Sequence, residues 1–157
     1  MAIEVGQKIP EMKLKMADGE EVSTAELFRG KKAVLFAVPG AFTPTCSDYH
    51  LPGFIDNADA IKAKGVDFLA CVAVNDHFVM AAWAKARQTG DKILMLADGN
   101  GDFARALGLE MDARPFGLGI RSKRYAAVIE DGVIKELKLD QPGKLEVSTA
   151  EEILKAL

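Results

Sequence analysis

Three short, almost continuously apolar runs alternate with segments of helical periodicity along this chain. Residues 33–38 read Ala-Val-Leu-Phe-Ala-Val, residues 66–74 read Val-Asp-Phe-Leu-Ala-Cys-Val-Ala-Val, and residues 93–97 read Ile-Leu-Met-Leu-Ala. Runs of this length and composition indicate strands that are buried on both faces, as in parallel sheets covered by helices. The pattern therefore places the chain in the α/β class, with right-handed crossovers between its parallel strands.

Helix and hairpin signals fall between and after these runs. Helices are predicted over residues 44–64 (one helix, or two with a break at Pro52-Gly53), from Asn75 or Asp76 to Gln88, over residues 102–107, and over residues 149–157 behind a capping box at Ser148 or Thr149. Asp18-Gly19, within residues 12–22, and Asp131-Gly132, between residues 125–129 and 133–139, are hairpin turn signals. Hairpins add antiparallel strands, so we expect a mixed central sheet flanked by helices.

One segment, residues 108–123, resists assignment. Loops of this length are uncommon in compact domains and are often functional. Its Met111, Phe116, Leu118 and Ile120 are more apolar than a solvated loop needs. Two interpretations stay open: the segment lines a site or an oligomer interface, or it packs on the core of its own chain.

The composition is that of one folded domain. The chain has 157 residues, of which 49% are hydrophobic and 27% charged, so we expect a single domain over residues 1–157 and exclude a mainly disordered chain. A net charge of −3 without a basic tract argues against binding to nucleic acid or to acidic membranes. No apolar run approaches the roughly 18 residues of a membrane span, and the first ten residues lack signal-peptide features. We therefore expect a cytosolic location.

No metal or cofactor is predicted. Two cysteines and two histidines, without a C-x-x-C pair, do not supply a four-ligand zinc site unless carboxylates contribute. Residues 98–102 imitate the start of a calcium loop. However, Phe103 and Leu109 stand where that loop needs glycine and glutamate.

The two cysteines have different predicted environments. Cys71 lies inside an unbroken apolar strand, where burial raises the pKa of a thiol and makes it inert. Cys46 follows a strand end by a short loop and begins a helix, with Pro44 suited to the first helical turn. Thiols at helix N-termini face unpaired N–H groups and the positive end of the helix dipole, which activates them. We therefore predict Cys46 as a reactive thiol, with the hydroxyl of Thr43 available to the same pocket.

His50 lies four residues after Cys46, on the same face of the predicted helix. This geometry admits a catalytic base. A packing or hydrogen-bonding histidine is the favoured interpretation.

The residues around Cys46 also form a specific motif. Pro39-Gly-Ala-Phe-Thr43-Pro-Thr-Cys46 matches the P-x-x-x-T-x-x-C signature of the peroxiredoxins, and residues 38–47 resemble the type II, or peroxiredoxin-5, branch. The resemblance continues essentially from end to end, through His50-Leu-Pro-Gly-Phe54, Val74-Asn-Asp76, Phe78-Val-Met80 and Leu96-Ala-Asp-Gly99. It implies a thioredoxin-like fold and a thiol-dependent peroxidase that reduces hydrogen peroxide and organic hydroperoxides.

The resemblance also assigns roles to four residues. Cys46 is then the peroxidatic cysteine, which forms a sulfenic acid. Thr43 hydrogen-bonds the thiolate and the peroxide, and Pro39 shields the sulfenate. Arg124 is the counterpart of the arginine that this family places at the start of a late strand, where its cation favours thiolate and stabilises the leaving oxygen. By composition alone, Arg121 is a rival.

The chain departs from part of the family in how its oxidised cysteine is reduced again. Some peroxiredoxin-5 members carry a resolving cysteine just before the C-terminal helix, but residues 144–149 contain none. Cys71 is a poor substitute because of its predicted burial. We therefore expect a one-cysteine mechanism, with glutathione and glutaredoxin, or thioredoxin, as the reductant. Relatives of this type form homodimers that contact near the active-site loops, which would give residues 108–123 a use.

Two other functions share the same scaffold. A peroxide sensor or relay would use the same Cys46 chemistry but pass its oxidation to a partner protein. A non-catalytic interaction domain would keep the fold alone, and the intact Pro39, Thr43, Cys46 and Arg124 argue against it. A disulfide reductase would need a C-x-x-C pair.

Overall fold

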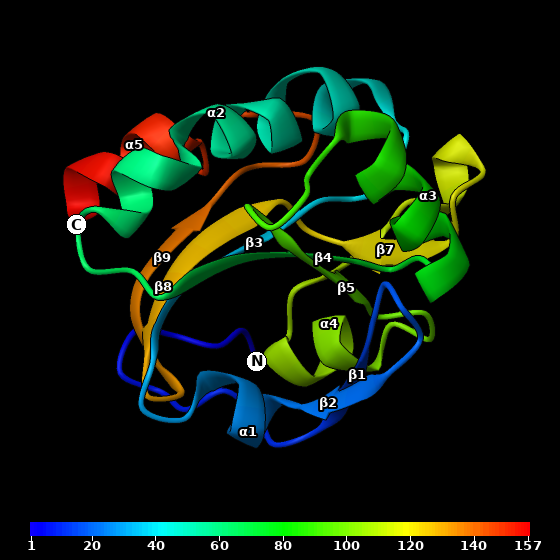
Figure 1. Cartoon of the computed structure of the whole chain (residues 1–157). Helices are drawn as coiled ribbons and strands as arrows, with labels where there is room; N and C mark the ends of the chain where they lie inside the picture. Colours follow the sequence, from blue (N-terminus) through cyan, green and yellow to red (C-terminus); the bar gives the residue numbers. More distant parts are fainter.

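The centre of the molecule is a seven-stranded mixed sheet in the order β2-β1-β5-β4-β3-β8-β9, in a computed structural model that describes all 157 residues (Figure 1). In chain order the elements are β1 (Lys13–Met16), β2 (Glu21–Ser23), α1 (Thr24–Phe28), β3 (Lys32–Ala37), η1 (Cys46–His50), α2 (Leu51–Lys62), β4 (Phe68–Ala73), α3 (His77–Arg87), β5 (Leu94–Ala97), α4 (Asp102–Leu107), β6 (Glu110–Asp112), η2 (Arg114–Phe116), β7 (Ile120–Ser122), β8 (Tyr125–Glu130), β9 (Val133–Leu139) and α5 (Ala150–Ala156).

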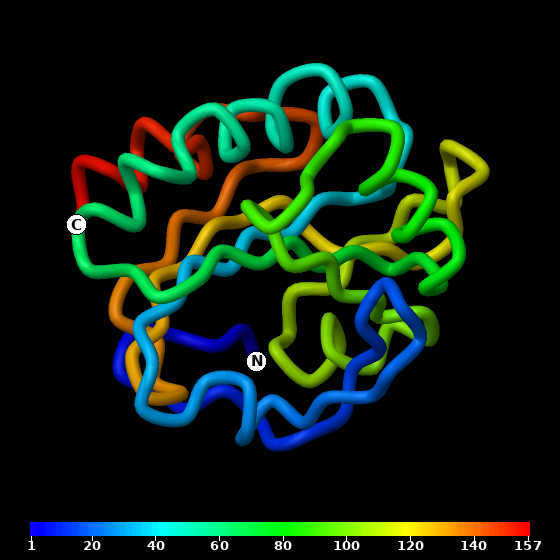
Figure 2. Tube along the Cα trace, in the orientation of Figure 1, coloured from blue at the N-terminus to red at the C-terminus, as the bar shows by residue number.

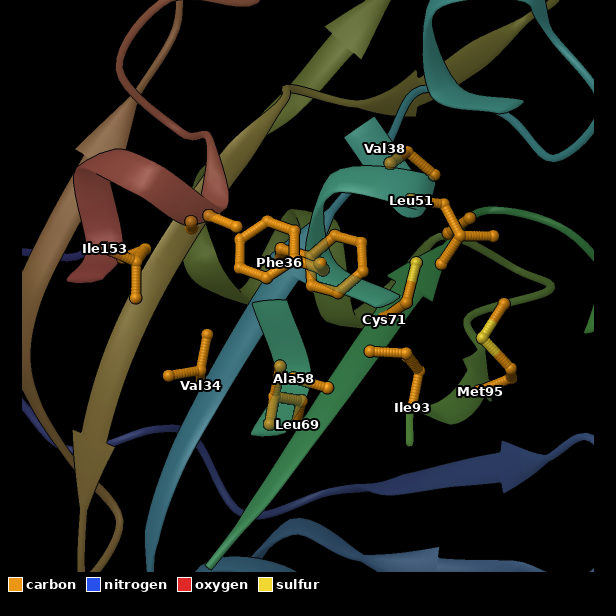
Figure 3. Close-up of a cluster of buried hydrophobic side chains, with 14 of the residues drawn as sticks. Val34, Phe36, Val38, Leu51, Ala58, Leu69, Cys71, Ile93, Met95 and Ile153 are labelled. Atoms are coloured by element: carbon orange, nitrogen blue, oxygen red, sulfur yellow. The ribbon is translucent and has the colours of Figure 1, made fainter. Parts of the chain in front are cut away.

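The three apolar runs form the middle of the sheet. β3 pairs with β4 and β4 with β5, both in parallel. Along β3, Val34 and Phe36 contribute to a core on one face of the sheet, whereas Ala33 and Leu35 contribute to a second core on the other face. Figure 3 shows part of the first core, with Phe36 from β3 and Cys71 from β4 among its side chains. Burial on both faces explains why the runs show no polar alternation.

Antiparallel hairpins extend both edges of the sheet. β8 pairs with β3 and then with β9, while β1 pairs with β5 and with β2. At the β8–β9 turn Asp131 and Gly132 have φ values of 48° and 79°, the left-handed pair that a tight hairpin turn requires. The predicted mixed sheet and both predicted hairpins are confirmed.

Helices cover both faces. α2, α3 and α5 pack on the face that carries Phe36, and α1 and α4 pack on the opposite face (Figures 1 and 2). The chain begins beside α4, where the N–H of Ile3 donates to the carbonyl of Leu107. It ends in α5, which lies beside α2 (Figure 2). No helix combines the length and the apolar character needed to cross a membrane.

The capping alternatives are now settled. Asp76, rather than Asn75, caps α3 by accepting a hydrogen bond from the N–H of Val79 at 2.8 Å. Thr149, rather than Ser148, caps α5 by accepting from the N–H of Glu152 at 3.2 Å. Each cap satisfies one of the unpaired N–H groups of its helix.

Residues 44–64, predicted as one helix or as two with a break at Pro52-Gly53, form one continuous helical stretch from residue 44 to Lys62, as in the first alternative. The unpredicted feature is a π-helical turn within it, η1, which passes into the regular helix α2 at Leu51. Pro52 follows directly on the π turn, in which the N–H of Leu51 bonds the carbonyl of Cys46.

Two short features were not predicted. Residues 108–123, left unassigned above, contain the two-stranded sheet of β6 and β7 with the 3₁₀ turn η2 between them. Helix α1 has only five residues and is capped by Ser23. Elements this short carry too few residues to display a period.

Candidate active site

Cys46 lies beyond the carboxyl end of β3, at the first residue of η1. The loop from Pro39 to Thr45 turns the chain into η1, and the N–H of Ser47 donates to the carbonyl of Thr43 at 2.9 Å. The side chain of Cys46 is fully buried in the core between the sheet and α2. The structure confirms the predicted placement of this thiol, after a central strand and near the start of a helix.

Arg124 contacts the sulfur directly. Its Nη2 donates a hydrogen bond to Cys46 Sγ at 3.1 Å, and only 9% of the residue is exposed. The register of the sheet brings the two together: β8 pairs with β3 so that Tyr125 lies opposite Ala37. Arg124, one residue before, therefore sits beside the loop that leads to Cys46.

Arg121, the rival candidate, binds backbone carbonyl groups instead of the sulfur. Its Nε donates to the carbonyl of Leu118 at 2.8 Å and its Nη1 to the carbonyl of Val74 at 3.2 Å. The same Nη1 lies close to Gly40. Arg121 thus links three loops around the site and makes no hydrogen bond to the sulfur.

His50 is a buried hydrogen-bonding residue, in agreement with the favoured interpretation. Its Nε2 lies 2.8 Å from the carbonyl oxygen of Ser148, and its Nδ1 lies 2.8 Å from Nη1 of Arg124. Because a carbonyl only accepts and a guanidinium only donates, the ring proton is on Nε2 and Nδ1 is the acceptor. Burial, and next the Arg124 cation, lower the pKa of His50 to about 4, so the ring is neutral at neutral pH.

Thr43 and Pro39 belong to the loop before Cys46, and both are partly exposed. Thr43 Oγ1 donates its proton to the carbonyl of Gly40 at 2.6 Å. A hydroxyl has a single proton, so this bond leaves Oγ1 with only its lone pairs to offer to a ligand. The structure does not place a hydrogen bond between Thr43 and Cys46.

Cys71 lies on β4 and is fully buried. Burial, and next the proximity of Cys46, raise the pKa of Cys71 well above its usual value, so this thiol stays protonated. Both cysteines are free. The predicted burial of Cys71 within an apolar strand is confirmed.

Asp140 and Ser148 are buried polar residues that sequence reasoning did not connect to the site. Ser148 was considered only as a helix cap, yet its carbonyl binds His50 across 98 positions of the chain. Asp140 accepts the hydroxyl proton of Ser148 at 2.6 Å. No local pattern signals contacts of this sequence separation. No group of three or more His, Cys, Asp or Glu side chains is placed to hold a metal ion.

The Arg124 guanidinium on Cys46 Sγ, above a mixed sheet, is the arrangement that the resemblance to thiol-dependent peroxidases with a thioredoxin-like fold led us to expect. The Redoxin family model matches residues 4–154. Peroxiredoxin-2E-2, chloroplastic, of Oryza sativa subsp. japonica is 56% identical over 99% of this chain and 72% of its own length. Peroxiredoxin-2C of the same species is 49% identical over 99% of this chain and 98% of its own length. The chain belongs to the peroxiredoxins of the Redoxin family.

Solved structures agree with this assignment. The crystal structure of reduced Prx3 from Vibrio vulnificus in complex with H2O2 has 55% sequence identity and a TM-score of 0.95, over 99% of both chains. Peroxiredoxin 5 from Alvinella pompejana has 37% identity and a TM-score of 0.87, over 98% of this chain and 97% of that one. The expected thioredoxin-like fold, the peroxiredoxin family and the thiol-dependent peroxidase activity are confirmed.

Proposed function

We propose that this peroxiredoxin reduces hydrogen peroxide and organic hydroperoxides at Cys46, and that an external thiol regenerates the oxidised sulfur. The single observation that carries the assignment of the site is the 3.1 Å hydrogen bond from Arg124 to Cys46 Sγ. A cation in that position stabilises a thiolate and remains next to the oxygen that leaves.

The first step is a two-electron oxidation of the sulfur. The Cys46 thiolate attacks the nearer oxygen of the peroxide, the O–O bond breaks, and its electron pair leaves on the distal oxygen. That oxygen takes up a proton and departs as water or as an alcohol, while Cys46 becomes a sulfenic acid. Arg124 stabilises the charge on the leaving oxygen. Thr43 Oγ1, whose own proton is held by Gly40, accepts a hydrogen bond from the peroxide, and Pro39 limits access to the sulfenic acid.

The second stage uses thiols from outside the chain. A first thiol attacks the sulfenic acid, giving a mixed disulfide and water, and a second thiol releases reduced Cys46 and a disulfide. The burial and the raised pKa of Cys71 on the central strand β4 support this proposal, because a buried, protonated thiol is a poor nucleophile toward a sulfenic acid. Glutathione with glutaredoxin, or thioredoxin, supplies the thiols. A cytosolic location, where both are reduced, is part of the proposal.

We also propose a homodimer that forms around the active-site loops. Phe78 is 74% exposed and Phe116 is 80% exposed, and Phe42 and Ile120 are exposed as well. Isolated exposed apolar residues are normal, but these lie in or beside the segments that Arg121 links: Phe42 follows Gly40, Phe78 is in the first turn of α3 after Val74, and Phe116 and Ile120 flank Leu118. A Phe116→Asp variant should shift the protein toward monomer in sedimentation equilibrium. Phe116→Asp protein with the same mass distribution as the wild type would contradict this interface.

The peroxidase proposal is tested by turnover with two reducing systems. Hydrogen peroxide consumption is coupled to NADPH oxidation through thioredoxin and its reductase, or through glutathione, glutaredoxin and glutathione reductase. Cys46→Ser should abolish turnover in both systems, while Cys71→Ala should retain it. Turnover lost in Cys71→Ala, with the first oxidation intact, would show that Cys71 resolves the sulfenic acid and would overturn the one-cysteine mechanism.

A further inference from the structure

We propose that Asp140 is a positioning residue of the peroxidase site, which acts on Arg124 through Ser148 and His50. This inference rests on the proposed roles of Cys46 and Arg124 and deepens them. It assigns to the segment after β9, residues 140–148, a part in the chemistry of a sulfur that it does not touch.

The Asp140 carboxylate fixes the conformation of this segment. Oδ1 accepts hydrogen bonds from the N–H groups of Glu146 and Val147 at 3.0 and 2.9 Å. Oδ2 accepts from the N–H and the hydroxyl of Ser148 at 3.1 and 2.6 Å. Burial alone would raise the pKa of Asp140, but the hydrogen bonds from Ser148, Val147 and Glu146 outweigh it and lower the pKa. An ionised carboxylate accepts and never donates, which suits four donors.

The Ser148 carbonyl transmits this constraint to His50. It accepts from Nε2 of the ring, which leaves Nδ1 without a proton and able to accept from Arg124. If the carbonyl moved away, the ring proton would no longer be fixed on Nε2. A proton on Nδ1 would face an N–H of Arg124, donor against donor. The position of Ser148, whose carbonyl oxygen lies 2.8 Å and whose Oγ lies 3.4 Å from Nε2, therefore decides whether His50 holds the guanidinium or repels it.

Asp140 also holds the main chain of Arg124. The N–H of Asp140 donates to the carbonyl of Arg124 at 3.0 Å, so this one residue constrains both the backbone and, through His50, the guanidinium. Each of the five residues from Asp140 to Cys46 exposes at most 9% of its surface: Asp140, Ser148, His50, Arg124 and Cys46. The five residues are therefore largely shielded from bulk water, and buried hydrogen-bond networks of this kind fix geometry.

The chain offers a matched control on the opposite face of the sheet. Asp98 is also buried, and its carboxylate accepts from the N–H groups of Phe103 and Ala104 at 3.0 and 2.9 Å, at the start of α4. It stabilises a turn in the same manner as Asp140. None of its hydrogen bonds leads to His50, Arg124 or Cys46.

The experiment is a double-mutant cycle read on the chemistry. The second-order rate constant for H2O2 is measured by stopped flow, with the fluorescence of Trp83, the single tryptophan, in the wild type, Asp140→Ala, Arg124→Ala and the double variant. Small misplacements of catalytic groups cost up to about 100-fold, so we expect a loss of roughly 10- to 100-fold in Asp140→Ala. In the Arg124→Ala background, Asp140→Ala should cause no further loss. Asp98→Ala should lower the thermal midpoint but leave the rate constant within about twofold.

Asp140→Asn and Ser148→Ala keep the test informative if Asp140→Ala folds poorly. Asp140→Asn retains one acceptor oxygen, and Ser148→Ala removes only the hydroxyl. Both variants should therefore lose less of the rate constant for H2O2 than Asp140→Ala does. Alkylation of Cys46 by iodoacetamide needs no stabilisation of a leaving oxygen. In each variant, the rate constant for alkylation should therefore fall less than the rate constant for peroxide reduction. Equal losses for both reagents would overturn the proposal.

A second readout reports the histidine itself. The chain has two histidines, so ¹⁵N NMR of the imidazoles separates His50 from His77. His50 should carry its proton on Nε2 in the wild type and in Asp98→Ala, and should lose this single tautomer in Asp140→Ala. An unchanged tautomer, an unchanged rate constant, or equal losses in both Arg124 backgrounds would each overturn the role of Asp140. An Arg124→Ala variant that reacts as fast as the wild type would instead overturn the proposed function of Arg124.

Discussion

Nη2 of Arg124 lies 3.1 Å from Sγ of Cys46, although 78 positions separate the two residues in the chain. The same guanidinium uses Nη1 to bind His50 at 2.8 Å. The planar fork of an arginine makes both contacts at once, with a charge that is present at every physiological pH.

Replacing Arg124 with lysine should therefore lower the rate constant for H2O2 although the positive charge is kept. A lysine ammonium is a point charge without a rigid fork, so it does not reproduce both contacts. We expect a loss of about 100-fold, typical of removing one donor to a developing oxyanion. Stopped-flow oxidation measures it. Arg87→Lys is the control, since Arg87 makes only an exposed ion pair with Asp48. Equal rate constants for Arg124→Lys and the wild type would refute the assignment.

His50 makes folding stability depend on pH. Its pKa is about 4 in the folded chain against 6.5 as the ordinary value, so the unfolded chain binds the proton more readily. The stabilisation is fully present above pH 6.5 and is lost as the pH falls from 6.5 toward 4. The shift corresponds to about 3 kcal/mol. In urea unfolding across this pH range, the free energy of unfolding should depend less steeply on pH for His50→Gln than for the wild type. Parallel pH dependences for the two proteins would be inconsistent with a buried neutral histidine.

Much of the fold follows from local sequence, because local physics determines it. The strands β3, β4 and β5 were predictable since burial on both faces leaves a continuous apolar run. Cys46 was predictable as a thiol between a strand end and a helix start. The choice of Arg124 over Arg121 came from the family resemblance and not from local physics, because it depends on the register that sets Tyr125 opposite Ala37.

The remaining features depend on contacts that are distant in sequence. The His50–Ser148 bond joins residues 98 positions apart, and neither residue carries a local signal of the other. The register of the sheet and the path of the segment after β9 determine this bond, and both are tertiary properties. The π-helical form of η1 likewise escaped a spacing argument, because a single π turn scarcely alters the apolar period.

Ser47 supports the turn that carries Cys46. Trp83 Nε1 donates to Ser47 Oγ at 2.9 Å, and both residues are buried. Ser47→Ala leaves the indole N–H without a partner, and should lower the free energy of unfolding by about 1–3 kcal/mol. Urea denaturation measures this cost. In a Trp83→Phe background the same substitution should cost much less. Equal costs in both backgrounds would show that the hydrogen bond is not the cause.

Gly108 tests the packing of the amino terminus. It has a φ of +69°, and a Cβ there would lie 2.2 Å from the carbonyl oxygen of Met1. Gly117 has a similar φ of +74°, but a Cβ would meet nothing within 4 Å. Both alanine variants carry the left-handed backbone strain of about 1–2 kcal/mol. Gly108→Ala should therefore be the less stable of the two in thermal unfolding, and equal midpoints would contradict the close approach of the amino terminus.

The central claim, that Cys46 alone reacts with peroxide, is tested most directly by intact mass spectrometry. Reduced protein receives one equivalent of H2O2 in the presence of dimedone, which traps sulfenic acids, with Cys46→Ser and Cys71→Ala treated in parallel. We predict one dimedone adduct in the wild type and in Cys71→Ala, and none in Cys46→Ser. A wild-type mass lower by two hydrogens, without an adduct, would reveal a Cys46–Cys71 disulfide, and an adduct that persists in Cys46→Ser would place the reactive thiol elsewhere.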